Sequence, residues 1–289
     1  MQIDADLLNI EYEMTGPDDG AVVLLLHGWP DDASTWADVA PVLNDAGLRT
    51  IAPMTRGFGG TRFLSAETPR TGNACRLAMD TIGLMDALGV DRFSIAGHDW
   101  GSNTAEAIAV GWPDRIERIA MLASPSRLGG VQTPSFQQAR LYWYHWFQAT
   151  ERGADAVRDD PKSFARIMWE SWSPTGWFDE AEFDRVARSF DTPDFVDVTL
   201  HSYRSRWDEA EPDPSSVWLE EKVKATKQLS IPCLFFQGEE DGVTPPEGSE
   251  KMPEKFTGPF ERILLPGVGH FPTREAPDRV APALAAHFG

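Results

Sequence analysis

The sequence has few cysteines, a shortage of positive charge and no apolar run long enough to cross a bilayer. Its two cysteines, Cys75 and Cys233, lie far apart and form no CxxC pair, so we expect buried thiols rather than a disulfide framework or a metal site. Lysine and arginine total 26 against 45 acidic residues. The resulting net charge of −19 disfavours nucleic acid and anionic membranes as partners.

Common cofactor and metal motifs are missing as well. There is no HExxH, no P-loop and no GxGxxG after a strand, so we expect neither a cofactor nor a metal. The first residues, MQIDADLLNIEYE, lack the basic start and apolar stretch of a signal peptide, and we expect a cytoplasmic location. A length of 289 residues fits one large domain, or a core with an insertion.

Short apolar runs alternate with helical patterns through the first third of the chain and again after residue 230. This order predicts an α/β fold, with a mostly parallel sheet covered by helices. The expected strands are 7–14 (or a hairpin there), 21–27, 48–53, 92–97, 115–124, 231–238 and 260–267; the expected helices are 34–47, 73–89, 102–111 and 273–288.

From about residue 127 to residue 227 no buried strand is expected. This segment contains turn-forming clusters such as SWSPTGWFDE and seven of the eleven tryptophans. We expect a helical cap inserted after the sixth strand, with a second hydrophobic core that also serves as a lid over a pocket. The domains are then core 1–126, cap 127–227 and core 228–289. The seven tryptophans are Trp143, Trp146, Trp169, Trp172, Trp177, Trp207 and Trp218.

Three chemically active residues follow three expected strands. Asp99 is the centre of Gly97-His98-Asp99-Trp100-Gly101, which has the outline of a nucleophile elbow with aspartate in place of serine. Asp241 and His270 each follow a later strand, and open α/β sheets place their sites at these carboxyl ends. The order nucleophile, acid, histidine is typical of α/β-hydrolases. The alternative makes Asp99 a helix N-cap, Asp241 a turn residue and His270 a surface loop residue.

Over essentially its whole length the chain resembles the α/β-hydrolase superfamily. Segment 24–36 (LLLHGWPDDASTW) matches the family's His-Gly-x-Pro turn, and segment 55–61 (TRGFGGT) matches its Arg-Gly-x-Gly loop, to which we assign a structural role. The resemblance implies an oxyanion hole formed by the backbone N–H groups of Trp29 and Trp100. Within this superfamily, an aspartate at the elbow makes the chain resemble epoxide hydrolases and haloalkane or haloacid dehalogenases.

A carboxylate nucleophile indicates a particular reaction. Because Asp99 is ionised at neutral pH, it can displace a leaving group from a saturated carbon and form an ester. His270, oriented by Asp241, would then deprotonate a water that attacks the Asp99 carbonyl.

The leaving group separates the two enzyme classes, because an epoxide oxygen needs a proton and a halide does not. Segments 141–153 (LYWYHWFQATERG) and 200–207 (LHSYRSRW) are similar to those in which epoxide hydrolases place two proton-donating tyrosines. The resemblance implies that Tyr144 and Tyr203 are the two proton donors. In the first segment Tyr142 is an alternative to Tyr144. The alternative is that the tyrosines only pack in an aromatic cap.

The dehalogenase interpretation depends on tryptophans. The indoles of Trp29 and Trp100 could hold a halide, but Trp100 stands where fluoroacetate-type dehalogenases have arginine, which disfavours a halo-acid substrate. Ser102 departs from the family's second glycine after the elbow. The strand before the cap ends in LASPS, with no carboxylate, so Asp241 is the expected acid. Other candidates are expected to be exposed (Glu239, Glu240), structural (His27, His98) or unsupported by any pattern (His145, His201, His287).

We therefore expect a hydrolase that opens a small apolar epoxide to a vicinal diol, with water as the second reactant. The alternatives are a hydrolytic haloalkane dehalogenase with the same three residues and a non-catalytic small-molecule binder. The expected substrate contacts are Trp29, Trp100, Trp143 and Trp146, because the aromatic insertion suggests an apolar ligand. A homodimer is the base-rate expectation.

Overall fold

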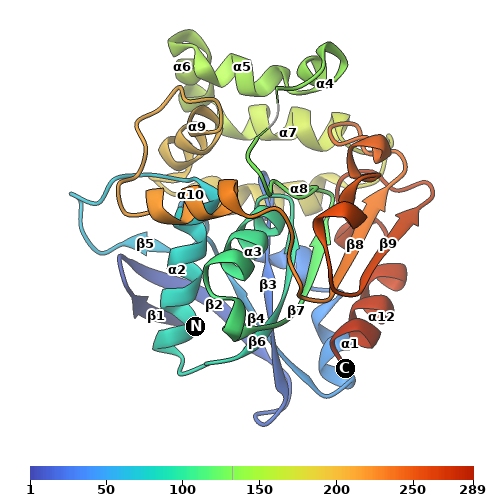
Figure 1. Cartoon of the computed structure of the whole chain (residues 1–289). Coiled ribbons are helices and arrows are strands. Elements are labelled where there is room, and N and C mark those ends of the chain that lie inside the picture. The colour runs from blue at the N-terminus through green and yellow to red at the C-terminus, as the bar shows by residue number, and fades with distance from the viewer. Residues whose placement is uncertain (132) are drawn as a thin grey trace.

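A mostly parallel sheet forms the centre of the molecule (Figure 1). The computed structural model describes residues 1–131 and 133–289, and in these residues nine strands form one sheet in the order β1-β2-β4-β3-β6-β7-β8-β9, with β5 paired to β2. Pairing is antiparallel up to β4 and parallel from there to β9. The strands are β1 (Gln2–Ala5), β2 (Leu8–Thr15), β3 (Ala21–Leu26), β4 (Leu48–Pro53), β5 (Arg62–Phe63), β6 (Phe93–His98), β7 (Ile116–Leu122), β8 (Cys233–Gly238) and β9 (Phe260–Leu265).

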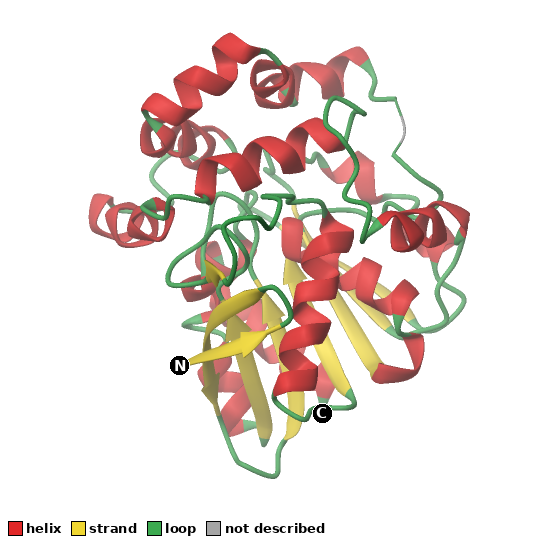
Figure 2. Ribbon diagram, turned by 90° about the vertical axis from the view of Figure 1, so that its left-hand side faces the viewer, coloured by secondary structure: helices red, strands yellow, loops and turns green. Residues whose placement is uncertain are grey.

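Helices cover both faces of the sheet and one of its ends (Figures 1 and 2). Five belong to the two core segments: α1 (Ala40–Asp45), α2 (Ala74–Ala87), α3 (Trp100–Gly111), α11 (Pro272–Glu275) and α12 (Pro277–Phe288). Those between β7 and β8 are α4 (Phe136–Leu141), α5 (Trp143–Ala149), α6 (Glu151–Asp159), α7 (Pro161–Ser171), α8 (Glu180–Ala187), α9 (Phe195–Ser205) and α10 (Val217–Ala225).

Alternation along the central strands divides the core between the two faces of the sheet. Leu24 and Ile95 pack with α2 and α3 on one face, whereas Val23 and Ala96 pack with α1 and α12 on the other. The central strands β3 and β6 are therefore buried on both faces, as their continuous apolar sequences predict.

The helical insertion, which we define as residues 127–227, contributes a third apolar cluster. This cluster is mostly aromatic, and it joins Phe164 and Trp169 of α7 to Trp29 and Trp100 of the core. The insertion therefore packs over the strand ends that precede the expected site. Its last helix, α10, instead packs against α3 and contributes Leu219 to the first core cluster.

Several expected elements differ in detail. The helix expected over 34–47 is divided into a 3₁₀ turn (Ala33–Trp36), capped by Asp32 rather than Ser34, and α1. Pro41 explains the division, since it has no N–H to continue the first helix. Pro277 divides the last helix in the same way, because the residue before a proline avoids helical geometry. The insertion follows the seventh strand, β7, and not the sixth as expected. The difference is the two-residue strand β5, which the sequence does not predict.

No helix formed by residues 1–131 and 133–289 has the length and apolar character of a membrane span. Within the same residues, no cluster of three or more histidine, cysteine or acidic side chains has the arrangement of a metal site.

Candidate active site

Asp99 lies at a strained turn between β6 and α3. Its backbone has φ 50° and ψ −109°, a left-handed conformation that costs a non-glycine residue free energy. The turn is tight enough that a Cβ on Gly97 would lie 2.2 Å from the Gly101 carbonyl oxygen, and one on Gly101 would lie 2.3 Å from that of Leu26. Both glycines of the elbow are therefore required to bring the Asp99 carboxylate to this position.

The three expected residues meet at the carboxyl ends of their strands. His270 Nε2 lies 3.5 Å from Asp99 Oδ2, and His270 Nδ1 lies 2.8 Å from Asp241 Oδ2. The second oxygen of Asp241 accepts hydrogen bonds from the backbone N–H groups of Val243 and Thr244, which fix the orientation of the carboxylate. Asp241 is buried, whereas its neighbours Glu239 and Glu240 are exposed.

Charge interactions within this row favour the ionised forms. Burial alone would lower the pKa of His270, but the carboxylates of Asp241 and Asp99 outweigh it and raise this pKa to about 10. Burial would raise the pKa of Asp99, yet His270 lowers it below its ordinary value. In the resting protein Asp99 is therefore an anion beside a protonated histidine.

One half of the expected oxyanion hole has the required geometry. The backbone N–H of Trp29 donates to Asp99 Oδ1 at 2.9 Å. Gly28 allows the turn to approach this closely, because a Cβ there would lie 2.5 Å from the Cβ of Asp99. Between the described residues Trp100 and Asp99 there is no corresponding bond to the carboxylate, so the part of Trp100 stays a prediction.

Sequence patterns did not indicate the residues that hold the histidine loop. The backbone N–H of His270 donates to Ser173 Oγ at 2.8 Å, and Ser173 donates to Glu275 at 2.7 Å. The Trp172 ring lies 4.9 Å from the imidazole and nearly perpendicular to it. Glu275 also accepts the N–H of Phe271, a local bond typical of a helix start. Trp172 and Ser173 come from the insertion and have no such local signal.

Two insertion tyrosines lie together above the Trp29 ring. Tyr144 of α5 and Tyr203 of α9 are both buried, and their ring centroids are 5.2 Å apart. Trp29 stacks with Tyr144 at 6.0 Å and meets the edge of Tyr203 at 5.1 Å. Burial, together with nearby negative charge, raises the pKa of both tyrosines well above 10, so both stay protonated. Tyr142 stacks on His145 instead, at 4.5 Å.

The tryptophans expected to contact substrate fall into two groups. Trp29 and Trp100 stack on each other at 6.4 Å, and both are buried. Trp143 and Trp146 are 39% and 37% exposed, and their principal ring contacts are with other insertion aromatics such as Phe164 and Trp207. The structure therefore does not bring this second pair together with Asp99.

The remaining histidines are engaged elsewhere. His27 Nε2 lies 3.1 Å from the Thr55 backbone nitrogen, and His98 Nε2 lies 2.7 Å from the His270 carbonyl oxygen. Burial lowers the pKa of His98 to about 4, so its ring is neutral. His145, His201 and His287 contact, respectively, the Trp207 indole, the Gly72 amide and the Ile119 carbonyl.

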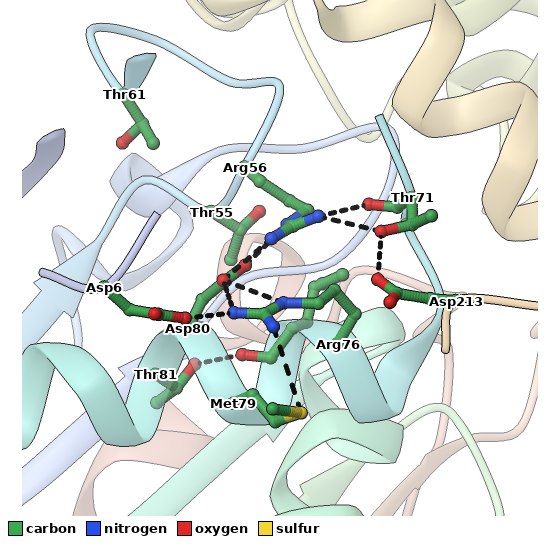
Figure 3. A network of polar contacts seen from close by, with 12 residues as sticks. Asp6, Thr55, Arg56, Thr61, Thr71, Arg76, Met79, Asp80, Thr81 and Asp213 are labelled. Atoms are coloured by element: carbon green, nitrogen blue, oxygen red, sulfur yellow. Dashed lines mark hydrogen bonds and ion pairs between the residues drawn. The ribbon is translucent and has the colours of Figure 1, made fainter. Parts of the chain in front are cut away.

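A buried ion-pair network, which we call the closed network, lies below the insertion (Figure 3). Arg56, from the Arg-Gly-x-Gly loop, donates to both oxygens of Asp80 and also to the carbonyl of Thr71. Arg76 pairs with Asp80 and with Asp6. The network ties the loop to α2 and to the first hairpin, in agreement with the structural role expected for it.

Three comparisons with known proteins agree with this fold. A family model for the alpha/beta hydrolase fold matches residues 21–277. Epoxide hydrolase A of Mycobacterium tuberculosis is 27% identical, and the alignment covers 98% of this chain and 94% of that protein. A fluoroacetate dehalogenase of Burkholderia sp is 30% identical, and the alignment covers 64% of this chain and 62% of that protein. The crystal structure of a candidate epoxide hydrolase from Klebsiella pneumoniae superposes with a TM-score of 0.93 at 37% identity, covering 99% of this chain and 96% of that one.

The chain therefore belongs to the α/β-hydrolase family. It is an enzyme similar to the epoxide hydrolases of that family.

Proposed function

We propose that this enzyme opens epoxides to vicinal diols through an ester on Asp99. The observation that carries the proposal is the row Asp99, His270 and Asp241, with the Trp29 N–H on one side of the nucleophile and two protonated tyrosines above Trp29. Epoxide hydrolase relatives that align with nearly the whole chain support the same reaction class.

In the first step Asp99 Oδ2 attacks an epoxide carbon, and the C–O bond of the ring breaks. Tyr144 and Tyr203 donate hydrogen bonds to the departing oxygen. One of them transfers its hydroxyl proton, so that this oxygen becomes a hydroxyl, and the resulting tyrosinate recovers a proton from solvent. Asp99 loses its negative charge when the ester forms. Because that charge helps to raise the pKa of His270, esterification lowers this pKa, so the ring releases its proton to solvent and the neutral imidazole can act as a base.

In the second step His270 deprotonates a water that attacks the carbonyl carbon of the ester. The oxygen held by the Trp29 N–H becomes an oxyanion, and this bond strengthens as charge develops. On collapse of the intermediate the leaving oxygen takes the proton held by His270, which releases the diol, and the Asp99 carboxyl ionises again. The oxygen of this water stays in the Asp99 carboxylate. A single turnover in water labelled with heavy oxygen should therefore label the enzyme and not the diol.

The tyrosines provide the test of the epoxide reaction. Phenylalanine at both Tyr144 and Tyr203 should lower epoxide turnover by about 10²–10⁴-fold, the usual contribution of a general acid. Tyr142→Phe is the matched control, because the Tyr142 ring stacks on His145 rather than on Tyr203. This variant should hydrolyse the epoxide at the wild-type rate. Epoxide turnover that survives in the double variant would contradict the assignment of these two residues.

Hydrolytic dehalogenation is the second candidate, and one observation favours it. The indole N–H groups of Trp29 and Trp100 are buried and make no hydrogen bond to the described residues, as a halide site requires. The core residue Trp36 shares this property, so the feature is not specific to the site. Bromide release from a bromoalkane that persists after loss of both tyrosines would favour dehalogenation over epoxide opening.

Other parts of the account are also proposals. The helical insertion serves as a cap over Asp99, and the division into core 1–126, cap 127–227 and core 228–289 describes the domains. A complete row of nucleophile, base and acid disfavours the non-catalytic binder. Cytoplasmic location and a homodimer stay predictions, which fractionation and light scattering would test.

A further inference from the structure

A cavity of about 540 Å³ lies beside Trp100, where the core meets the helical insertion. Its volume is within the usual range for small-molecule sites. The walls come from α2, α3, the segment after β7, the end of α9 and α10. They include Trp100 and Asn103, and Asn103 donates a hydrogen bond to the backbone carbonyl of Asp99 at 2.9 Å. Asp99 itself does not line the cavity, but its two neighbours in the site, Trp100 and Asn103, do.

Two arginines line this cavity without a carboxylate partner in the described part of the chain. Arg127 follows β7, and its side chain makes no ion pair or hydrogen bond to any described residue. The guanidinium of Arg206 lies 5.1 Å from the centre of the Tyr203 ring, and its Nη1 lies 3.4 Å from His145 Nε2. Both side chains are half-buried. Burial lowers the pKa of Arg127 to about 10, and repulsion by the positive charge of Arg206 contributes to this lowering.

Three acidic side chains lie in the same walls as the arginines. Burial raises the pKa of Glu106 to about 6, and its Oε1 accepts the backbone N–H of Arg127 rather than the side chain. Glu220 accepts a hydrogen bond from Ser216, and Asp208 is exposed to solvent. Within the described residues, none of the three forms an ion pair with either guanidinium. Both guanidiniums therefore line the cavity without an ion-pair partner among the described residues.

The arginines also lie close to the proposed chemistry. Arg206 is three residues beyond Tyr203 in sequence and contacts its ring. Both guanidiniums oppose the rise in the pKa of the Tyr203 hydroxyl that burial and Asp99 cause. A ligand group bound between them would lie next to the same tyrosine that faces Trp29.

We propose that Arg127 and Arg206 bind the carboxylate of an acid-bearing epoxide, so that the substrate carries a negative charge at the end remote from the reacting ring. Guanidinium groups match the planar geometry of a carboxylate and form strong, charge-assisted hydrogen bonds with it. A protein with a net charge of −19 repels anions, and a local pair of arginines is the feature that overcomes this repulsion. This inference rests on the proposed epoxide hydrolysis and changes the expected substrate from purely apolar to amphipathic.

The test compares acid-bearing terminal epoxides of increasing chain length with their matching primary amides, which have the same shape and no charge. The wild-type enzyme should prefer the best acid over its amide in kcat/KM by at least about tenfold, as expected for a hydrogen-bonded charge pair. Arg127→Met and Arg206→Met should each reduce this ratio, and the double variant should abolish it. Arg152→Met removes one exposed positive charge from α6 and should leave the ratio unchanged.

A binding measurement separates failure of this inference from failure of the proposed reaction. Calorimetry with an alkanoate that has no epoxide should show binding that is lost in Arg127→Met and retained in Arg152→Met. If amides and acids are turned over equally and the alkanoate does not bind, the carboxylate site is wrong while epoxide hydrolysis stands. If no epoxide reacts but the alkanoate binds through the arginines, the proposed reaction is wrong and the anion site stands.

Discussion

Two groups of buried or half-buried arginines in this protein differ in their partners. In the closed network, Arg56 and Arg76 share Asp80 and also reach Thr71 and Asp6, so each guanidinium is paired within the protein. Arg127 and Arg206 line the cavity beside Trp100, and within the described residues no carboxylate pairs with them. We call the latter pair, together with Asp99 and His270, the open site.

The comparison separates structural charge from functional charge. A buried ion pair that is fully satisfied holds segments together but presents nothing to a ligand. Charges left without partners cost stability, and they persist where a substrate or transition state provides the partner. Backbone strain does not follow the same division, since Asp6 of the closed network has φ 49° and Asp99 of the open site has φ 50°.

The largest expected effect is the loss of the nucleophile from the open site. Asp99→Ala should reduce epoxide turnover by at least about 10⁴-fold, because the ester can no longer form. Folding should survive, since Ala123 already adopts a comparable backbone angle of φ 60° in this chain. Kinetics and thermal unfolding of the same sample measure the two effects. A variant that loses turnover only because it is unfolded would contradict the proposed division.

A change in the closed network should have the opposite result. Asp80→Ala leaves two buried guanidiniums without their shared partner and should lower the free energy of unfolding by about 3–5 kcal/mol. Activity per folded molecule should be retained below the lowered melting temperature. Asp18→Ala is the control, because it removes the exposed partner of Arg49 and should change the melting temperature little. Equal melting temperatures for the two variants would show that the network is not stabilising.

The smallest expected effect concerns pH. The folded pKa of His270, about 10, exceeds the 6.5 of an unfolded histidine. Its contribution to stability is therefore complete below pH 6.5 and is lost as the pH rises through 10. Removing the Asp99 charge in Asp99→Ala should lower this pKa, and NMR titration of the ring measures the change. His98 is an internal reference that should stay neutral above pH 4. If His270 has the same pKa in the wild type and in Asp99→Ala, the Asp99 charge does not raise the pKa of His270 as proposed.

Short-range signals explain why much of the fold could be predicted from the sequence. Apolar runs of strand length, separated by segments with helical spacing, indicate the parallel sheet. The helix expected over 73–89 is present as α2, and its cap Asn73 is a finding of the structure. Asp99 comes directly after β6, and Asp241 and His270 lie in short loops after β8 and β9. Parallel pairing of β6, β7, β8 and β9 is therefore enough to bring them to one edge.

The contents of the insertion could not be predicted in the same way. Helical spacing shows that a segment is helical, but not which face packs on the core. The choice between Tyr142 and Tyr144, the position of Trp172 beside His270 and the meeting of Arg127 with Arg206 all depend on such packing. For the same reason the sequence favours Trp143 and Trp146 as substrate contacts, although both rings are partly exposed and pack with other insertion aromatics.

The central claim is that Asp99 forms an ester with an epoxide, and intact-protein mass spectrometry tests it most directly. His270→Gln should form the ester but not hydrolyse it, and adding Asp99→Ala should prevent the adduct. We predict a mass gain equal to the whole epoxide when the protein is incubated with styrene oxide or an acid-bearing terminal epoxide. An adduct only from a bromoalkane, equal to the alkyl group without bromine, or an epoxide adduct that remains after Asp99→Ala, would contradict the claim.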